Sequence, residues 1–211
     1  LLRKYMKILL IETSRTYSSG SKGIRMSLPL GLLYIATPLE KAGYSVSIYS
    51  CLCSPSTRVL EHEGVIHHGV DDDDFKEMVI KEKPDIVGIS CPFTAQFDQY
   101  VYASQLVKEV DQNIFVVGGG PHFSVCGSNF LLKNLNTDCY ISGEGEEPML
   151  ALVANTVNNI SLNGIPGITY RNKNDGTIKS MPNEYFKEMD DLEFPAYHLF
   201  NMDLYFEYQR N

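Results

Sequence analysis

Short apolar runs alternate with segments of helical periodicity along the first 160 residues of the chain. Nearly continuous apolar runs are typical of strands that a sheet buries on both faces. We predict strands at residues 6–11, 44–49, 85–90, 114–117 and 138–142, and helices at residues 30–42, 72–82, 97–110, 123–135 and 148–158. Five such units predict an α/β fold, a doubly wound five-stranded parallel sheet of Rossmann-like or flavodoxin-like type in the order 2-1-3-4-5.

Proline, glycine and acidic residues mark where the predicted helices begin and end. Pro29 suits the first turn of helix 30–42, Pro38 predicts a kink within it, and Gly43 ends it. Four consecutive carboxylates at residues 71–74 precede the next helix, where negative charge complements the helix dipole. Consecutive carboxylates cannot all converge on one ion, so we interpret them as charge at a helix terminus rather than as a metal site.

The pattern changes after residue 160. Residues 168–171 and 177–181 are short β-rich runs separated by a polar turn, which predicts a β-hairpin. Two segments, residues 51–68 and the aromatic-rich residues 184–211, have no clear periodicity. We therefore predict a Rossmann-like domain at 1–160, a β-hairpin extension at 161–183 and a linker at 184–211.

The net charge of −8 limits the partners that we expect. Nucleic acids and anionic membrane surfaces attract basic patches, so we expect neither as a partner. No apolar run approaches the roughly 20 residues that span a bilayer, and residues 1–11 are interpreted as a strand because Glu12 directly follows them. The five cysteines are irregularly spaced and match no zinc site, which predicts reduced thiols in a cytoplasmic protein.

Four loops at the carboxyl edge of the predicted sheet form the candidate binding site, because open parallel sheets bind ligands there. The loops are residues 13–23, 90–96, 118–122 and 143–147, after strands one, three, four and five. Glycine in three of them lets the backbone approach a ligand closely. Neither a phosphate loop nor Gly-x-Gly-x-x-Gly after the first strand is present, which disfavours ATP and NAD. No nucleophile–base pair stands out, so we predict no catalytic residue.

Five short motifs, in order along the chain, carry a family resemblance. They are residues 29–36 (PLGLLYIA), 83–90 (KPDIVGIS), 117–122 (VGGGPH), 143–146 (GEGE) and 165–171 (IPGITYR). The set covers nearly the whole chain and resembles the N-terminal cobalamin-binding domain of cobalamin-dependent radical S-adenosylmethionine (SAM) enzymes. That family includes methyltransferases and the anaerobic magnesium-protoporphyrin monomethyl ester cyclase.

The resemblance implies that cobalamin (vitamin B12) binds across the candidate loops. The cofactor-binding residues that we expect are Thr13, Ser14, Gly31, Ser90, Thr94, Gly118, Gly119, Gly120, Pro121, His122, Gly143, Glu144, Gly145 and Glu146. Cobalamin mutases and methionine synthase carry Asp-x-His-x-x-Gly, whose His ligates cobalt, and this sequence has no such motif. We therefore expect no protein His on cobalt and no metal-ligating residue in the chain.

The resemblance also implies a partner domain. Residues 186–200 (FKEMDDLEFPAYHLF) resemble the segment that leads into the radical SAM domain of such enzymes. That domain opens with Cys-x-x-x-Cys-x-x-Cys, which holds a [4Fe–4S] cluster and leaves one iron for SAM. The spacing is absent here, so we expect a truncated chain, inactive alone, whose partner is the missing radical SAM domain. We also expect that the fragment can form a dimer through residues 184–211. Whether the parent methylates or cyclises its substrate stays open.

Two other functions of the same fold also stay open. One is a cofactor-free interaction or regulatory domain, although a phospho-receiver needs an Asp where Thr13 and Ser14 follow strand one. The other is a flavodoxin-like flavin protein. Its hydroxyl-rich first loop loosely matches this chain, whereas aromatic residues to sandwich a flavin are not evident in the later loops.

Overall fold

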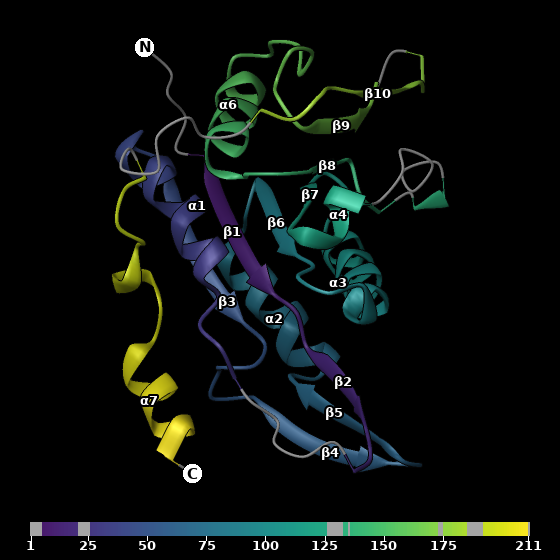
Figure 1. Ribbon diagram of the computed structural model, residues 1–211, viewed down its shortest axis with the longest axis vertical. Helices are drawn as coiled ribbons and strands as arrows, with labels where there is room; N and C mark the ends of the chain where they lie inside the picture. The colour runs from purple at the N-terminus through teal and green to yellow at the C-terminus, as the bar shows by residue number, and fades with distance from the viewer. Residues whose placement is uncertain are drawn as a thin grey trace.

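A seven-stranded sheet runs through the middle of the molecule (Figure 1). The computed structural model describes residues 6–20, 26–125, 133–134, 136–172, 175–184 and 192–210. Five parallel strands form the centre of the sheet: β1 (Lys7–Glu12), β3 (Ser45–Ser50), β6 (Ile86–Ser90), β7 (Phe115–Gly119) and β8 (Cys139–Ile141). Their order, β3-β1-β6-β7-β8, confirms the predicted order 2-1-3-4-5.

The predicted hairpin joins this sheet. β9 (Ile168–Arg171) pairs antiparallel with β8, and β10 (Ile178–Ser180) pairs antiparallel with β9. The sheet therefore has seven strands rather than five, because the hairpin satisfies the backbone groups that β8 presents at the edge of the parallel sheet. The predicted domain boundary at residue 160 stays a prediction.

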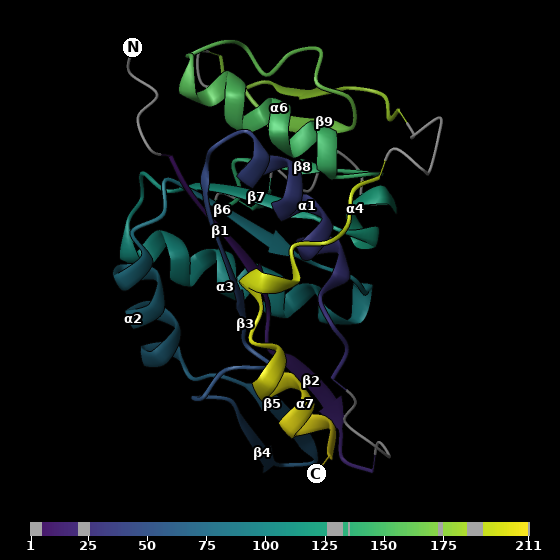
Figure 2. The same ribbon diagram turned by 90° about the vertical axis from the view of Figure 1, so that its left-hand side faces the viewer.

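Helices cover both faces of the sheet (Figure 2). One face carries α1 (Leu30–Lys41) and α6 (Glu146–Val157), and the other carries α2 (Asp72–Glu82) and α3 (Phe97–Val110). Along β1, Ile8 and Leu10 belong to the α1 and α6 core, and Leu9 and Ile11 belong to the α2 and α3 core. Each of these four side chains is buried, which explains why the strand is apolar at successive positions.

The helix boundaries follow the signals in the sequence. Pro29 is the N-cap residue of α1, and Pro38 lies inside the helix. The Asp71 side chain caps α2 by accepting a hydrogen bond from the backbone N–H of Asp74 at 3.0 Å. Lys83 ends α2 in the left-handed conformation. The acidic run therefore begins a helix, as predicted.

The helix predicted at residues 123–135 is described only in part. α4 (Pro121–Val125) begins two residues earlier, directly after β7, because the proline suits a first helical turn. Residues 126–132 and 135 of that prediction lie outside the described residues. A short 3-10 helix, η1 (Thr94–Gln96), precedes α3.

A second, three-stranded antiparallel sheet was not predicted. It contains β2 (Arg15–Ser18), β5 (Val65–Gly69) and β4 (Arg58–His62), in that order. The expectation of irregular structure at residues 51–68 is therefore wrong from residue 58 onward, as is that of a plain loop after β1. Glu63 and Gly64, both at positive φ, form the two-residue turn between β4 and β5, a conformation that matches the twist of a tight hairpin.

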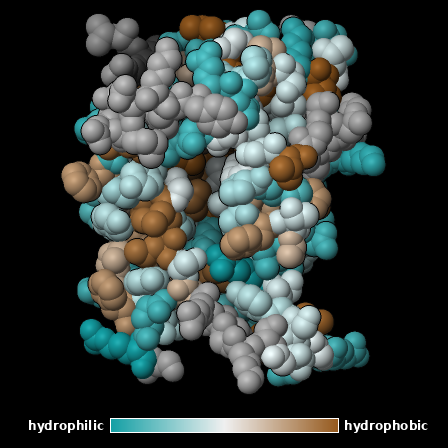
Figure 3. Space-filling view, viewed as in Figure 1, coloured by the Kyte–Doolittle hydropathy of each residue, from teal (hydrophilic) through white to brown (hydrophobic). Residues whose placement is uncertain are grey.

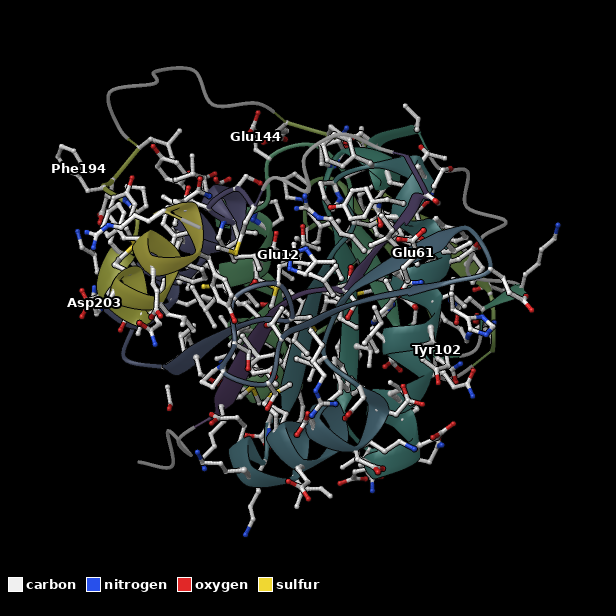
Figure 4. The ribbon with its side chains drawn as sticks, turned by 90° about the horizontal axis from the view of Figure 1, so that it is seen from below. Glu12, Glu61, Tyr102, Glu144, Phe194 and Asp203 are labelled. Carbon is white, nitrogen blue, oxygen red and sulfur yellow. The ribbon has the colours of Figure 1, made fainter. Side chains whose placement is uncertain are left out.

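The carboxyl-terminal segment, residues 192–210, lies along α1 and β3. It contains the 3-10 helix η3 (Tyr197–Leu199) and α7 (Met202–Arg210). The backbone N–H of Ala196 donates to the Leu33 carbonyl oxygen at 3.1 Å, and Phe200 is buried beside Leu33. Phe194, by contrast, is 91 % exposed and points away from the body of the molecule (Figure 4). The described part of the predicted linker is thus attached to the sheet domain.

Candidate functional site

The glycine loops converge on a cavity of about 690 Å³ on the α1 and α6 face of the sheet. Its walls come from the carboxyl ends of β1, β6, β7 and β8 and from the first turns of α1, α4 and α6. Figure 3 shows the molecule hollowed near the middle of this face, with hydrophobic residues in the hollow. We call it the glycine-rimmed cavity, because Gly31, Gly119, Gly120, Gly143 and Gly145 lie around it.

The interior of the glycine-rimmed cavity is apolar. Leu10, Ile35, Val117 and Met149 line it from β1, α1, β7 and α6. Gly88 of β6 lets Leu10 pack directly against the backbone at the bottom of the cavity, because a Cβ atom on Gly88 would lie 2.8 Å from Leu10 Cδ2. Apolar walls around a depression of this size suit a flat organic group that is removed from water.

The rim offers open backbone where β7 ends. A Cβ atom built on Gly119 would meet no heavy atom within 4 Å, so the side-chain direction of this residue points into free space. Its neighbour Gly118 is different, since a Cβ atom there would lie 2.6 Å from the Phe123 ring. Gly119 therefore faces the open cavity, whereas Gly118 allows the Phe123 ring to pack against the strand.

A buried charged pair lies at the end of β1. Glu12 is 5 % exposed and sits inside the molecule in Figure 4. Its carboxylate accepts hydrogen bonds from Ser50 Oγ at 2.6 Å and from the Arg15 guanidinium at 2.8 Å. Burial raises the pKa of Glu12, against the lowering effect of the two partners. Arg15 is the one cationic side chain among the described residues that line the cavity.

Glu146, at the start of α6, has a side-chain oxygen without a hydrogen-bond partner in the described part of the chain. This atom, Oε2, is buried. Burial raises the pKa of Glu146, and the neighbouring Glu144 and Glu147 carboxylates add to the effect. A buried oxygen without a partner costs free energy unless a ligand satisfies it. This carboxyl is therefore suited to a ligand that offers amide or hydroxyl groups.

The structure brings together ten of the fourteen predicted site residues. They are Gly31, Ser90, Gly118, Gly119, Gly120, Pro121, Gly143, Glu144, Gly145 and Glu146, all of which line the glycine-rimmed cavity. Thr13 and Ser14 instead line a second cavity of about 610 Å³, between the small sheet and helices α2 and α3. Which of the fourteen bind a ligand stays a prediction.

His122 and Thr94 line neither cavity. They contact each other, with His122 Nδ1 lying 3.1 Å from Thr94 Oγ1. The His122 ring also packs against Phe97, with 4.5 Å between the ring centroids. Burial lowers the pKa of His122, which favours the neutral ring.

Sequence reasoning missed the interior of the cavity and part of its mouth. Leu10, Gly88 and Met149 resembled ordinary core residues, because nothing in a linear pattern shows which core positions border a gap. The sequence predicts a loop at Arg15, whereas the residue begins strand β2, which brings its side chain to the mouth of the glycine-rimmed cavity. The signal that was available is a cationic residue three positions after the end of β1.

Within the described residues, no group of three or more His, Cys, Asp or Glu side chains is arranged to hold a metal ion. Among those same residues, no helix is long and apolar enough to cross a membrane. Cys51, Cys53, Cys91 and Cys139 are buried, and burial raises the pKa of the Cys51 thiol to about 12. A thiol with so high a pKa is a poor nucleophile at neutral pH.

The chain is similar to known proteins over most of its length. The model of the B12 binding domain family matches residues 27–153. Cytidylyl-2-hydroxyethylphosphonate methyltransferase of Streptomyces wedmorensis is 30 % identical over 229 residues, covering 97 % of this chain and 42 % of the relative. The anaerobic magnesium-protoporphyrin IX monomethyl ester cyclase of Synechocystis sp. is 26 % identical over 187 residues, covering 88 % of this chain and 34 % of the relative. This chain therefore spans about two fifths or less of the length of these relatives.

A solved structure shares the fold. The cobalamin-dependent S-adenosylmethionine radical enzyme OxsB, with aqua-cobalamin and S-adenosylmethionine bound, matches with a TM-score of 0.74 at 14 % identity. The match covers 98 % of this chain and 26 % of that protein. The predicted Rossmann-like architecture is confirmed.

Proposed function

This chain belongs to the B12-binding domain family and is related to cobalamin-dependent radical SAM enzymes, and from that membership we propose that its glycine-rimmed cavity holds cobalamin. The glycines of the rim would hold the corrin ring at the carboxyl edge of the sheet, and the apolar interior would hold the nucleotide tail. The observation that carries the proposal is the cavity itself, which opens between four strand ends and the first turns of α1 and α6.

The residues present fit this cofactor. Gly119 leaves backbone and space at the rim, where a large planar ring needs close approach. The unpartnered Oε2 of Glu146 can accept a hydrogen bond from the amide groups that surround a corrin. The apolar interior, with Met149 and Val117 on its walls, excludes water from an aromatic base.

We further propose that no protein histidine ligates the cobalt. His122, the histidine nearest to the rim in sequence, is engaged with Thr94 and Phe97. The described lining of the glycine-rimmed cavity contains no histidine. The protein would then position the cofactor by contacts between the cavity rim and the corrin and by contacts with the nucleotide tail. The cobalt would stay accessible to a partner.

We propose that the parent protein couples this module to a radical SAM domain with a [4Fe–4S] cluster. The support is the relationship to a methyltransferase and a cyclase, both longer than this chain. Bound cobalamin would supply the cobalt centre for the reaction of the parent protein. The residues described here bind and orient the cofactor and shield it from water, and the reaction itself, methyl transfer or oxidative cyclisation, belongs to the whole protein.

Titration of the chain with hydroxocobalamin tests the proposal. We expect a saturable change in the visible spectrum, with weaker binding of cobinamide, which lacks the nucleotide tail. The His122→Ala variant is expected to leave the spectrum of the bound cobalt unchanged. Binding of flavin mononucleotide instead would contradict the proposal. So would no corrin binding at about 100 μM, the concentration at which a weak complex of about −5.5 kcal/mol is half saturated.

A further inference from the structure

The loop that follows β8 is held by a part of the chain outside residues 27–153. The backbone N–H of Ser142 donates to the Gly167 carbonyl oxygen at 3.0 Å, and the backbone N–H of Gly167 donates to the Pro182 carbonyl oxygen at 2.9 Å. Residues 143–146, which follow directly, line the glycine-rimmed cavity. The β9–β10 hairpin region therefore contacts the site loop at its base.

Gly167 comes so close to the loop that only glycine fits. A Cβ atom at this position would lie 2.3 Å from the Ser142 carbonyl oxygen, and φ is 69°. Both the space and the conformation exclude a side chain. The backbone of Gly167 therefore packs directly against the backbone of Ser142, which fixes the position of the loop relative to the hairpin.

Asn183 completes the contact through a side-chain network. Ser142 Oγ lies 3.0 Å from the Gly167 carbonyl oxygen and 2.7 Å from Asn183 Oδ1. A hydroxyl has a single proton, so it cannot donate to both oxygens. Both contacts are satisfied when the Asn183 amide is turned so that its nitrogen donates to Ser142, while the hydroxyl donates to Gly167.

The same amide restricts the next residue of the loop. A Cβ atom on Gly143 would lie 3.3 Å from Asn183 Cγ, so the amide packs directly against Gly143 in either orientation. The backbone N–H of Gly143 also donates to Ser124 Oγ of α4 at 3.1 Å. The loop is therefore held between α4 and the end of the hairpin, with its shape set before any ligand arrives.

We propose that Asn183 is a positioning residue for the cofactor site, a brace that holds residues 143–146 in the conformation that cobalamin meets. The inference rests on the proposed function for its ligand. A loop that is ordered in advance lowers the entropic cost of binding, so loss of the brace weakens affinity more than it weakens the fold.

The test compares Asn183→Ala with Ser180→Ala in the whole chain. Ser180 is a matched control, because its hydroxyl makes one hydrogen bond on the same hairpin, to Thr169 at 2.9 Å, away from the loop. The measurements are hydroxocobalamin affinity by visible absorption, Tm, and amide hydrogen exchange of Ser142 and Gly143 without cofactor. We expect Asn183→Ala to weaken affinity about tenfold, the effect of one lost hydrogen bond, and to speed exchange at both amides.

A double-variant cycle sharpens the test. Ser142→Ala removes the hydroxyl that Asn183 contacts, so the double variant should bind about as weakly as Ser142→Ala alone. Wild-type affinity and exchange in Asn183→Ala overturn the inference, as does an equal loss in Ser180→Ala. If the wild-type chain binds no hydroxocobalamin, the proposed function fails, and hydrogen exchange alone decides whether Asn183 holds the loop.

Discussion

Gly119 is the residue at which folding and ligand binding separate most cleanly. A Cβ atom at this position meets no heavy atom within 4 Å and points into the open cavity, so we expect Gly119→Leu to leave Tm nearly unchanged. The added side chain enters the space proposed for the corrin, and we expect hydroxocobalamin affinity to fall about 100-fold, which corresponds to about 2.7 kcal/mol. Gly119→Ala adds a smaller side chain and serves as the control, and its affinity for hydroxocobalamin should fall much less. Full affinity in Gly119→Leu would place the ligand elsewhere.

Glu146 predicts a pH dependence of stability without cofactor. Because burial raises its pKa above the ordinary 4.5, the folded state holds the proton more tightly than the unfolded chain does. This contribution to stability is complete below the unfolded pKa and is lost as pH rises through the folded pKa. Glu146→Gln cannot titrate, so in urea unfolding its free energy of unfolding should rise relative to that of the wild type as the pH increases from the ordinary 4.5 through the raised pKa of Glu146. Parallel curves over this range would show that the carboxyl is not desolvated.

At the scale of elements, one buried ion pair ties α3 to two strands. Lys108 is 6 % exposed, and its Nζ donates to Asp138 at 2.8 Å and to the Ile114 carbonyl oxygen at 2.6 Å. We expect Lys108→Met to lower the unfolding free energy by about 3 kcal/mol, because the partly buried Asp138 carboxylate loses its cationic partner.

The exposed pair of Lys76 and Glu109, at 2.6 Å, supplies the control for that measurement. Both side chains are well solvated, so Lys76→Met should leave denaturant unfolding unchanged within error. Equal effects of Lys108→Met and Lys76→Met would show that burial does not set the strength of these pairs.

The elements also show what a linear pattern can predict. The parallel strands and most helices were predictable, because burial on two faces and helical periodicity are local signals, as in β1 and in helix α2. The small sheet was not, since β4 is exposed along its whole length and carries no core pattern. The loops of the site were predictable from strand ends, whereas its apolar floor depends on the register between β1, β6 and β7.

At the scale of the whole molecule, one buried aromatic residue attaches the carboxyl-terminal segment to the domain. Phe200 packs with Leu33 and Cys53, so Phe200→Ala should release residues 192–210. We expect chymotrypsin to cleave at Tyr205 and Phe206 about tenfold faster, because cleavage follows the population of the open segment. Phe194→Ala is the control, because this ring is 91 % exposed. Chymotrypsin should cleave this variant at Tyr205 and Phe206 at the wild-type rate. Mass spectrometry of the fragments measures both.

The strand order has a consequence for biosynthesis. After β1 and β3 pair, β6 adds to the free edge of β1, and β7, β8, β9 and β10 each add to the strand made just before. No later strand has to insert between two that are already paired. The central sheet can therefore be assembled in the order in which a ribosome releases the chain, with each new strand joining an edge that is already in place.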